Sequence, residues 1–286
     1  MILVTGSTGN AGSEVLKQLA ATGAKVRAAY LSAEKAAQAP AGVETTVLDF
    51  AKPETIAASL RGIEKVFLVA PSLPNQPELE GNVTDAAKKA GIKHLVKLSV
   101  IGAVSKGGTF MDWHRQAEEQ IEASGVPFTF LRCNGFFQNM INYNAGTIQS
   151  QNAFYSAMED ARVSHVDLRD IGAVAVKTLT TAGHEGKAYD ITGPEALTNA
   201  EMAATLSKVL GRTITCVDLP PADLRQAMIG MGIADWYADA LLDLYRFYRT
   251  GAGSAVSDSV EKITGRKAGT FEAFAREFAG RFQKAA

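Results

Sequence analysis

The sequence predicts an α/β fold: a doubly wound parallel sheet with a smaller, mostly helical C-terminal lobe. Two observations support this prediction. Short apolar runs rich in β-branched residues alternate with amphipathic segments through the first half of the chain. The first of these runs leads through closely spaced glycines into a helical pattern. Such alternation implies a parallel sheet covered on both faces, with ligands bound at the carboxyl ends of its strands.

The predicted elements of the sheet follow one another as far as Arg132. Strands are expected at 2–4, 25–30, 46–48, 66–70, 94–100 and 128–132. Helices are expected from the glycines to Gly23, from Pro53 to Gly62, and at 77–90 and 112–124. We predict that residues 1–132 form one domain.

The regular alternation of strand and helix patterns ends after Arg132. The segment 133–164 is rich in Asn, Gln and aromatic residues and is predicted to be irregular. A helix at 167–181 is expected to rejoin the sheet, so residues 163–182 are assigned to the first domain. Residues 133–162 and 183–286 are assigned to the smaller lobe, with short strands at 187–192 and 213–219 and helices at 199–210, 221–231, 234–249 and 270–282.

The composition of the chain narrows the range of functions that it could have. The 286 residues carry a formal net charge of −1, so no basic excess favours a nucleic-acid partner. No apolar run reaches membrane-spanning length, and Met1 leads directly into the first strand, so we expect a cytoplasmic protein without a signal peptide or membrane segment. Cys133 and Cys216 have no metal-binding or redox spacing, and we expect two buried free thiols and no metal.

The first strand–turn–helix unit predicts a phosphate-binding loop. Its glycines follow the pattern G-x-x-G-x-x-G: the first allows a sharp turn, the second a close approach of backbone to a pyrophosphate, and the third close packing of helix on strand. The helix N-terminus adds free N–H groups and a partial positive charge. The alternative is a plain tight turn. The expected loop comprises Gly6, Ser7, Thr8, Gly9, Asn10, Ala11 and Gly12.

Four further stretches of the sequence resemble those of a known protein family. They are SVIGA at 99–103, SGVPFTFLRCNGFFQN at 124–139, VDLRDIGAVAV at 166–176 and SDSVEKITGRKAGTFEAFARE at 257–277. Together with the glycine loop, they resemble the NmrA-like atypical short-chain dehydrogenase/reductase family. That family contains bacterial NADPH–quinone reductases, triphenylmethane reductases, plant phenylpropanoid reductases and non-catalytic redox-sensing regulators. The resemblance implies that residues 1–132 are an NAD(P)-binding Rossmann domain and that the lobe binds substrate.

The end of the second predicted strand bears on the choice of cofactor. NAD enzymes usually place an acidic residue there, but this chain has Tyr30, Leu31 and Ser32. NADPH-preferring relatives commonly have Arg at the position of Leu31, and that Arg is also missing. Ser32 and Lys35 remain to hold a 2′-phosphate, with Arg27 nearby in sequence. We therefore expect NADP (NADPH), with NAD as the alternative.

The resemblance implies further contacts along the cofactor. It places Asp49 and Phe50 along the adenine, against the alternative of a turn Asp and a core Phe. It places Val69, Ala70 and Pro71 over the ribose side, and Ser99 and Val100 in the nicotinamide pocket. The turn after the sixth strand would wrap the nicotinamide end through Asn134, Gly135, Phe136 and Phe137. Phe137, Asn139 and Tyr143 would contact the substrate, although the aromatic residues also suit a hydrophobic hinge.

His114 is the candidate catalytic residue. The superfamily's Tyr-x-x-x-Lys pair is absent from the segment around it, which reads DWHRQAE. His114 stands where phenylpropanoid reductases keep a lysine, and its imidazole would contact a carbonyl or the ribose. The alternative is a surface histidine.

These features together predict an NAD(P)H-dependent oxidoreductase that transfers a hydride to a flat, electron-poor small molecule such as a quinone. An activated acceptor needs little acid catalysis, which is compatible with loss of the Tyr-x-x-x-Lys pair. The alternative is a non-catalytic NAD(P)-sensing regulator.

Overall fold

The computed structural model describes residues 1–37, 39–105 and 107–283, and these form a central seven-stranded parallel sheet that confirms the predicted fold class. The strand order is β3-β2-β1-β4-β5-β6-β8, so the direction of winding reverses between β1 and β4. The strands are β1 (Ile2–Val4), β2 (Val26–Tyr30), β3 (Glu44–Val47), β4 (Lys65–Leu68), β5 (His94–Val100), β6 (Phe128–Cys133) and β8 (Lys187–Ile191).

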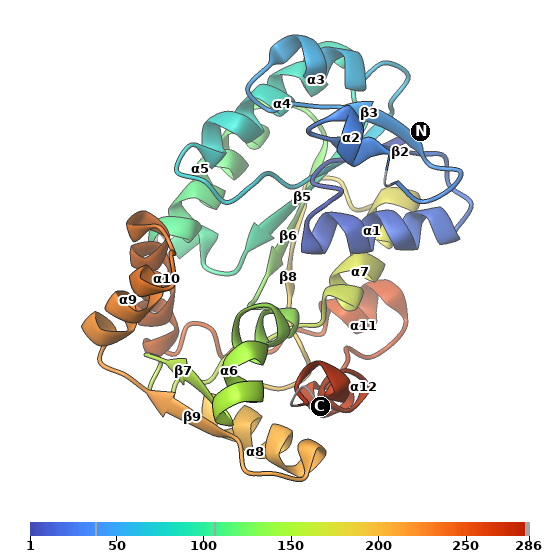
Figure 1. The fold of residues 1–286 in the computed structure, drawn as a ribbon. Helices are drawn as coiled ribbons and strands as arrows, with labels where there is room; N and C mark the ends of the chain where they lie inside the picture. The colour runs from blue at the N-terminus through green and yellow to red at the C-terminus, as the bar shows by residue number, and fades with distance from the viewer. Residues whose placement is uncertain (38, 106, 284–286) are drawn as a thin grey trace.

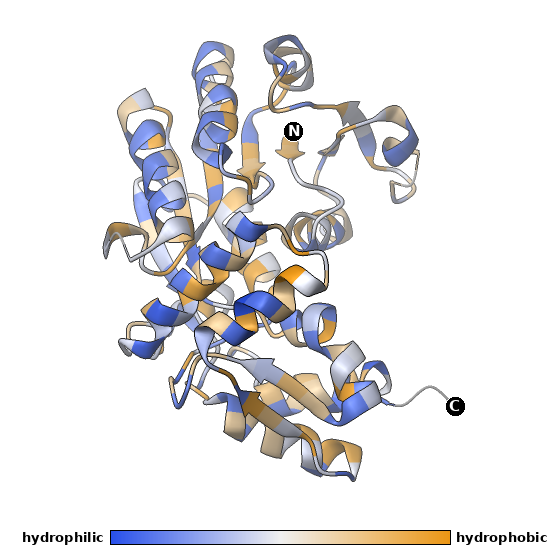
Figure 2. Ribbon diagram, turned by 60° about the vertical axis from the view of Figure 1, so that its left-hand side comes forward, coloured by the Kyte–Doolittle hydropathy of each residue, from blue (hydrophilic) through white to orange (hydrophobic). Residues whose placement is uncertain are grey.

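Helices cover both faces of this sheet (Figure 1). α1 (Asn10–Ala21) and α7 (Leu168–Thr180) pack on one face, and α3 (Pro53–Ser59), α4 (Gln76–Ala90) and α5 (Thr109–Ser124) pack on the other. Because side chains alternate across a strand, β1, β2, β4, β5 and β6 each contribute buried residues to both hydrophobic cores. Figure 2 shows the resulting pattern, with the helices mixing hydrophobic and hydrophilic residues.

The smaller lobe lies below the sheet in Figure 1 and is built around a second, two-stranded parallel sheet. Its strands are β7 (Ala153–Ser156) and β9 (Thr215–Asp218), and its helices are α6 (Ala145–Gln151), α8 (Asn199–Leu210), α9 (Pro221–Gly230), α10 (Asp235–Arg249) and α12 (Phe271–Glu277). Within the described residues, no helix combines the length and apolar composition needed to cross a bilayer.

The structure corrects several predictions in the second half. The segment 133–164 is not irregular: it contains a π-helical turn (Met140–Asn144), α6 and β7. β7 depends on its pairing with β9, a distant partner that local sequence does not reveal. The strand predicted at 187–192 is β8, which pairs with β6 in the large sheet and so does not belong to the smaller lobe. The helix predicted at 270–282 breaks after α12 into a 3₁₀ turn, Ala279–Arg281.

Two short helices were not predicted: α2 (Ala33–Ala36) and α11 (Ser259–Thr264). The rest of the domain division stays a prediction, and its last residues, 284–286, lie outside the described part of the chain. Both cysteines are free, but only Cys133 is buried. Cys216 is half-buried, and burial raises its pKa to about 11.

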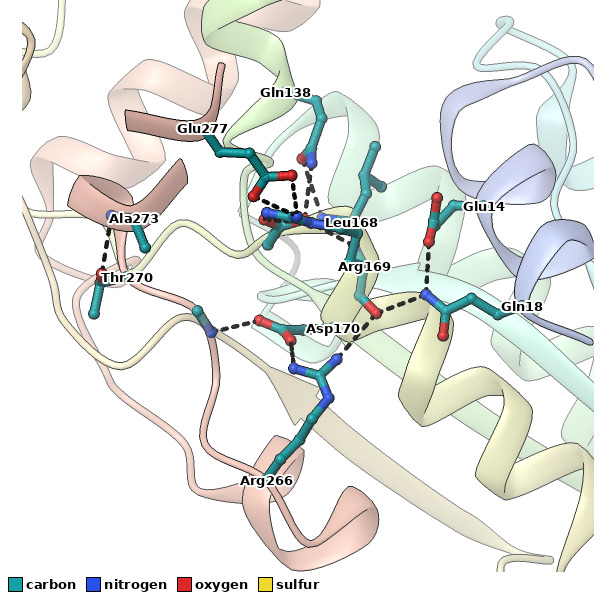
Figure 3. Close-up of polar contacts among 12 residues, drawn as sticks. Glu14, Gln18, Gln138, Leu168, Arg169, Asp170, Arg266, Thr270, Ala273 and Glu277 are labelled. Carbon is teal, nitrogen blue, oxygen red and sulfur yellow. Dashed lines mark hydrogen bonds and ion pairs between the residues drawn. The ribbon is translucent and has the colours of Figure 1, made fainter. Parts of the chain in front are cut away.

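A polar joint at the start of α7 connects the two parts of the molecule (Figure 3). The buried Asp167 accepts the Arg169 N–H at 2.9 Å and so caps the helix. Burial raises the pKa of this carboxyl, but hydrogen bonds from Arg169 outweigh that effect and lower it overall. The Arg169 guanidinium also pairs with Glu277 at 2.7 Å, and the Arg169 carbonyl accepts from Gln18 of α1. The joint ties α1, α7 and α12 together at one point.

A buried histidine at the opposite edge of the sheet makes stability depend on pH. His94, at the start of β5, is inaccessible to solvent, and burial lowers its pKa to about 4. Its Nε2 lies 2.8 Å from Oγ1 of Thr129, which itself donates to the His184 carbonyl, so the imidazole is the donor to Thr129.

We therefore expect stability to fall as the pH is lowered from about 6.5 to about 4. In this window His94 binds a proton in the unfolded chain but not in the folded protein. The contribution of His94 to the loss in free energy of unfolding reaches about 3 kcal/mol. Urea denaturation across the window measures it. His94→Gln should make the pH dependence less steep without removing it, because burial also lowers the pKa values of His114 and His165. Thr129→Val removes the hydrogen bond and should leave the pH dependence in place. An equally steep pH dependence in His94→Gln would contradict the assignment.

Candidate functional site

The three glycines of the loop, Gly6, Gly9 and Gly12, have different structural roles. Gly6 adopts a left-handed φ of +60°, and a Cβ there would lie 2.7 Å from Cγ1 of Val69. A Cβ on Gly12 would collide with the carbonyl oxygen of Gly6, so only glycine allows α1 to approach the turn. Gly9 differs, because its φ of −84° suits any residue and it is exposed.

The start of α1 fits an anionic group. Gly9 is its N-cap, no described side chain caps the helix, and its first turn carries no acidic residue. The first helical hydrogen bond runs from the Ser13 N–H to the Gly9 carbonyl at 2.9 Å. The N–H groups of Asn10, Ala11 and Gly12 precede it and therefore have no acceptor within the helix. These groups and the helix dipole suit a phosphate. Thr8 and Asn10 are exposed, whereas the buried Ser7 hydroxyl donates to the Val4 carbonyl and braces the turn.

The two cations expected near the 2′-phosphate, Lys35 and Arg27, differ in their surroundings. Leu31 is exposed, and the Ser32 hydroxyl accepts the Lys35 N–H at 3.3 Å as the cap of α2. The Lys35 side chain is exposed. Arg27 is engaged elsewhere, with Glu44 and with the carbonyl groups of Ser59 and Arg61 at the end of α3 and just after it.

If Lys35 reads the 2′-phosphate, Lys35→Gln should weaken NADPH binding by about 1 kcal/mol, roughly fivefold, and leave NADH binding unchanged. Titration calorimetry with both cofactors measures the difference. Lys17→Gln is the control, because it removes the charge of another exposed lysine, on α1. Equal weakening of the two cofactors would exclude this role for Lys35, and tighter binding of NADH by the parent would contradict the expected preference.

The ends of β3 and β4 lie on either side of the loop's strand. Asp49 accepts the Ala51 N–H at 3.0 Å and is half-buried, and the Phe50 ring packs partly against the α3–α4 core. The alternative of a turn Asp and a core Phe therefore has structural support. Val69 contacts Gly6 and exchanges hydrogen bonds with the Thr5 hydroxyl. Ala70 is half-buried and Pro71 exposed just beyond β4.

The predicted residues at the end of β5 and after β6 include buried polar side chains that hold the backbone in place and others that are partly exposed. The buried Ser99 hydroxyl donates to Glu118 at 2.7 Å, while Val100 is half-buried. The Asn134 amide is satisfied by Ser164, Gly253 and its own neighbour Gly135, so it locks this turn.

Phe137 does not suit a substrate surface. Its ring is 2% exposed and packs against Phe271 and Phe274 in the core of the smaller lobe. The prediction that its ring stacks on substrate is therefore wrong. Phe136 and Asn139 are half-buried, and Tyr143 is 63% exposed.

His114 lies in a buried polar network rather than on a free surface. It is half-buried in the second turn of α5, which begins at the edge where β5 ends. Its Nδ1 lies 3.1 Å from Nζ of Lys97, and the Gln76 amide nitrogen lies 3.3 and 3.4 Å from the two ring nitrogens. Burial and the Lys97 cation lower the pKa of His114 well below its ordinary value, so the imidazole is neutral.

An aromatic cluster beside His114 was not predicted as a site. Figure 1 shows α10 alongside the start of α5, and their rings meet there. The pair Trp113–Trp236 has a centroid distance of 6.0 Å, and Phe110 contacts Tyr237 edge-on at 5.7 Å. Burial and the neighbouring Tyr143 raise the pKa of Tyr237. We call Phe110, Trp113, Tyr143, Trp236 and Tyr237 the α5–α10 aromatic cluster.

Comparison with known proteins gives consistent results. The model of the NmrA-like family matches residues 1–275. The chain is 40% identical to the NAD(P)H azoreductase of Xenophilus azovorans and 38% identical to the (4-alkanoyl-5-oxo-2,5-dihydrofuran-3-yl)methyl phosphate reductase of Streptomyces griseus, over 99% of both chains in each case. The NADPH complex of the Escherichia coli quinone oxidoreductase QOR2 superposes with a TM-score of 0.90 at 28% identity, covering 98% of this chain and 100% of that one.

Proposed function

The chain belongs to the NmrA-like family, and on that premise we propose that it is an NAD(P)H-dependent reductase of flat, electron-poor small molecules. The single observation that carries the proposal is the uncapped start of α1 beside a glycine turn that tolerates no Cβ at Gly12. A 40% identical relative over the full length is an NAD(P)H azoreductase, so the regulator alternative is not favoured.

The residues present fit a dinucleotide. The N–H groups at the start of α1 would hold the pyrophosphate, and Ser32 and Lys35 would hold a 2′-phosphate, so we favour NADPH over NADH. When bound, the reduced nicotinamide supplies a hydride to the acceptor. The turn at Gly135 and Phe136 follows β6 at the carboxyl edge of the sheet, where this end of the cofactor is expected.

The α5–α10 aromatic cluster defines the substrate class within the proposal. Its rings would pack against a planar conjugated acceptor and orient it, and desolvated aromatic pairs contribute about 0.5–1.5 kcal/mol each beyond the area they bury. A quinone or an azo compound accepts a hydride without strong acid catalysis, because solvent can protonate the reduced product. A cytoplasmic location, where NADPH is regenerated, is part of the proposal.

The deciding experiment follows NADPH oxidation with a panel of quinones and azo compounds, beside a measurement of cofactor binding. Both tryptophans of the chain lie in the cluster, so their fluorescence reports acceptor binding directly. We expect turnover with the acceptors that quench this fluorescence. Cofactor binding without turnover on any acceptor would overturn the proposal and favour the regulator.

A further inference from the structure

The ammonium of Lys97 has a contact for each of its three hydrogens. Its Nζ lies 2.6 Å from Oε2 of Glu80, 3.1 Å from the Leu98 carbonyl oxygen and 3.1 Å from Nδ1 of His114. Lys97 is fully buried and Glu80 is 1% exposed. An ammonium only donates hydrogen bonds, so Nδ1 of His114 must accept, and the single ring hydrogen must be on Nε2.

We propose that Lys97 is a positioning residue that holds His114 as the neutral Nε2–H tautomer, so that its imidazole donates a hydrogen bond to the acceptor without giving up a proton. This deepens the proposed reductase function and rests on it. An acceptor such as a quinone would gain the hydride from the nicotinamide and then one proton from solvent, while His114 keeps its own.

The cost of burying this ion pair argues against a purely structural role. A buried Lys–Glu pair is often no more stabilising than apolar side chains of similar size. Here one ammonium hydrogen is directed to His114. Protonation of Nδ1 would replace that hydrogen bond with two cations about 3 Å apart, while the Glu80 carboxylate contacts the same ammonium at 2.6 Å.

Within residues 1–37, 39–105 and 107–283, Lys97 is the charged side chain within hydrogen-bond distance of the His114 ring. Several charged or polar groups on neighbouring elements have partners of their own, whereas Oδ1 of Asp112 is buried without one among these residues. On β5 and β6, Ser99 and Arg132 bind Glu118, and on α10 Asp243 binds Thr109. On α5 itself Arg115 pairs with three glutamates, and Asp112 lies two residues away. From α4, only Gln76 joins Lys97 at the ring.

The test uses the full chain labelled with ¹⁵N in its histidine rings. With four histidines, the His114 signals are assigned by their loss in His114→Gln. Two-bond ¹H–¹⁵N spectra distinguish Nε2–H from Nδ1–H. From about pH 8 to about pH 5 we expect His114 to remain neutral and Nε2-protonated. In the double variant E80Q/K97M, which removes both charges, we expect mixed tautomers and titration closer to the ordinary histidine range, whereas K97R should resemble the parent.

A second readout links the tautomer to function. The parent's turnover should be independent of His114 ionisation over this pH range, and the double variant should show a step at the pH where His114 titrates. Mixed tautomers in the parent, or an unchanged tautomer in the folded double variant, would overturn the proposal. If E80Q/K97M does not fold, E80L/K97M fills the same space with apolar groups, and the same spectra and turnover measurements are made on that variant. Failure of the reductase function would appear only as absent turnover, since the spectra need no substrate.

Discussion

Replacing Gly9 with valine is expected to abolish NADPH binding while leaving the fold intact. The residue is exposed and has an ordinary φ of −84°, and its nearest steric limit is the Gly6 carbonyl oxygen, 3.3 Å from an added Cβ. A valine side chain would occupy the place where a pyrophosphate approaches the helix N-terminus. We expect at least about a hundredfold loss of affinity, because the phosphates would lose several charge-assisted hydrogen bonds. Calorimetry gives the affinity, and thermal unfolding checks the fold.

Two comparisons make this result specific. Ala21→Val places the same side chain at the exposed end of α1 and should change neither affinity nor stability. Gly12→Ala should reduce stability itself, because its Cβ has no room beside Gly6. A folded Gly9→Val variant that binds NADPH like the parent would show that the cofactor does not lie on this loop.

Local signals were enough to predict the large sheet. β5 and α8 have the predicted bounds, and Gly91 and Gly125 end α4 and α5 in the left-handed conformation. These features depend on apolar periodicity and helix caps, which lie within a few residues of each other. β8 was recognised as a strand but assigned to the smaller lobe, since its partner β6 is far away in the chain.

The candidate site was harder to predict because its parts come from distant segments. The glycine loop is a continuous motif, and its steric restrictions match the prediction. In contrast, Lys97 of β5 contacts His114 of α5 and pairs with Glu80 of α4, and a lysine inside a strand pattern gives no sign of a buried partner. The ring of Phe137 points into a core formed by α12, so an aromatic residue beside the expected site was mistaken for part of it.

The α5–α10 aromatic cluster could have been suspected. Trp113 adjoins His114, and α10 begins with Asp235, Trp236 and Tyr237, an aromatic pair at the start of an amphipathic helix. What the sequence lacks is the packing of α10 against α5, which depends on contacts such as Phe247 beside Gly102 and Gly107. Small residues at these positions leave room for the phenylalanine ring.

Truncation of His114 to alanine is expected to lower turnover by about ten- to a thousandfold, while NADPH affinity changes little. The neutral imidazole lies at the edge of the sheet where the nicotinamide is expected, next to Trp113 of the aromatic cluster. Removing it takes away a hydrogen bond that would strengthen as negative charge develops on the acceptor. Steady-state kinetics with a quinone and a separate binding titration distinguish the two effects, and Gln116→Ala, two residues further along α5 and exposed, is the control.

His114→Gln distinguishes positioning from proton transfer. Glutamine keeps an N–H donor but does not titrate, so a neutral histidine that only donates a hydrogen bond should be largely replaced by it. We expect most of the lost turnover to return, without a change in pH dependence. Failure of glutamine to restore turnover would instead support proton transfer by the imidazole. If His114→Ala leaves both turnover and affinity unaltered, the histidine takes no part, and hydride transfer depends on proximity and orientation alone.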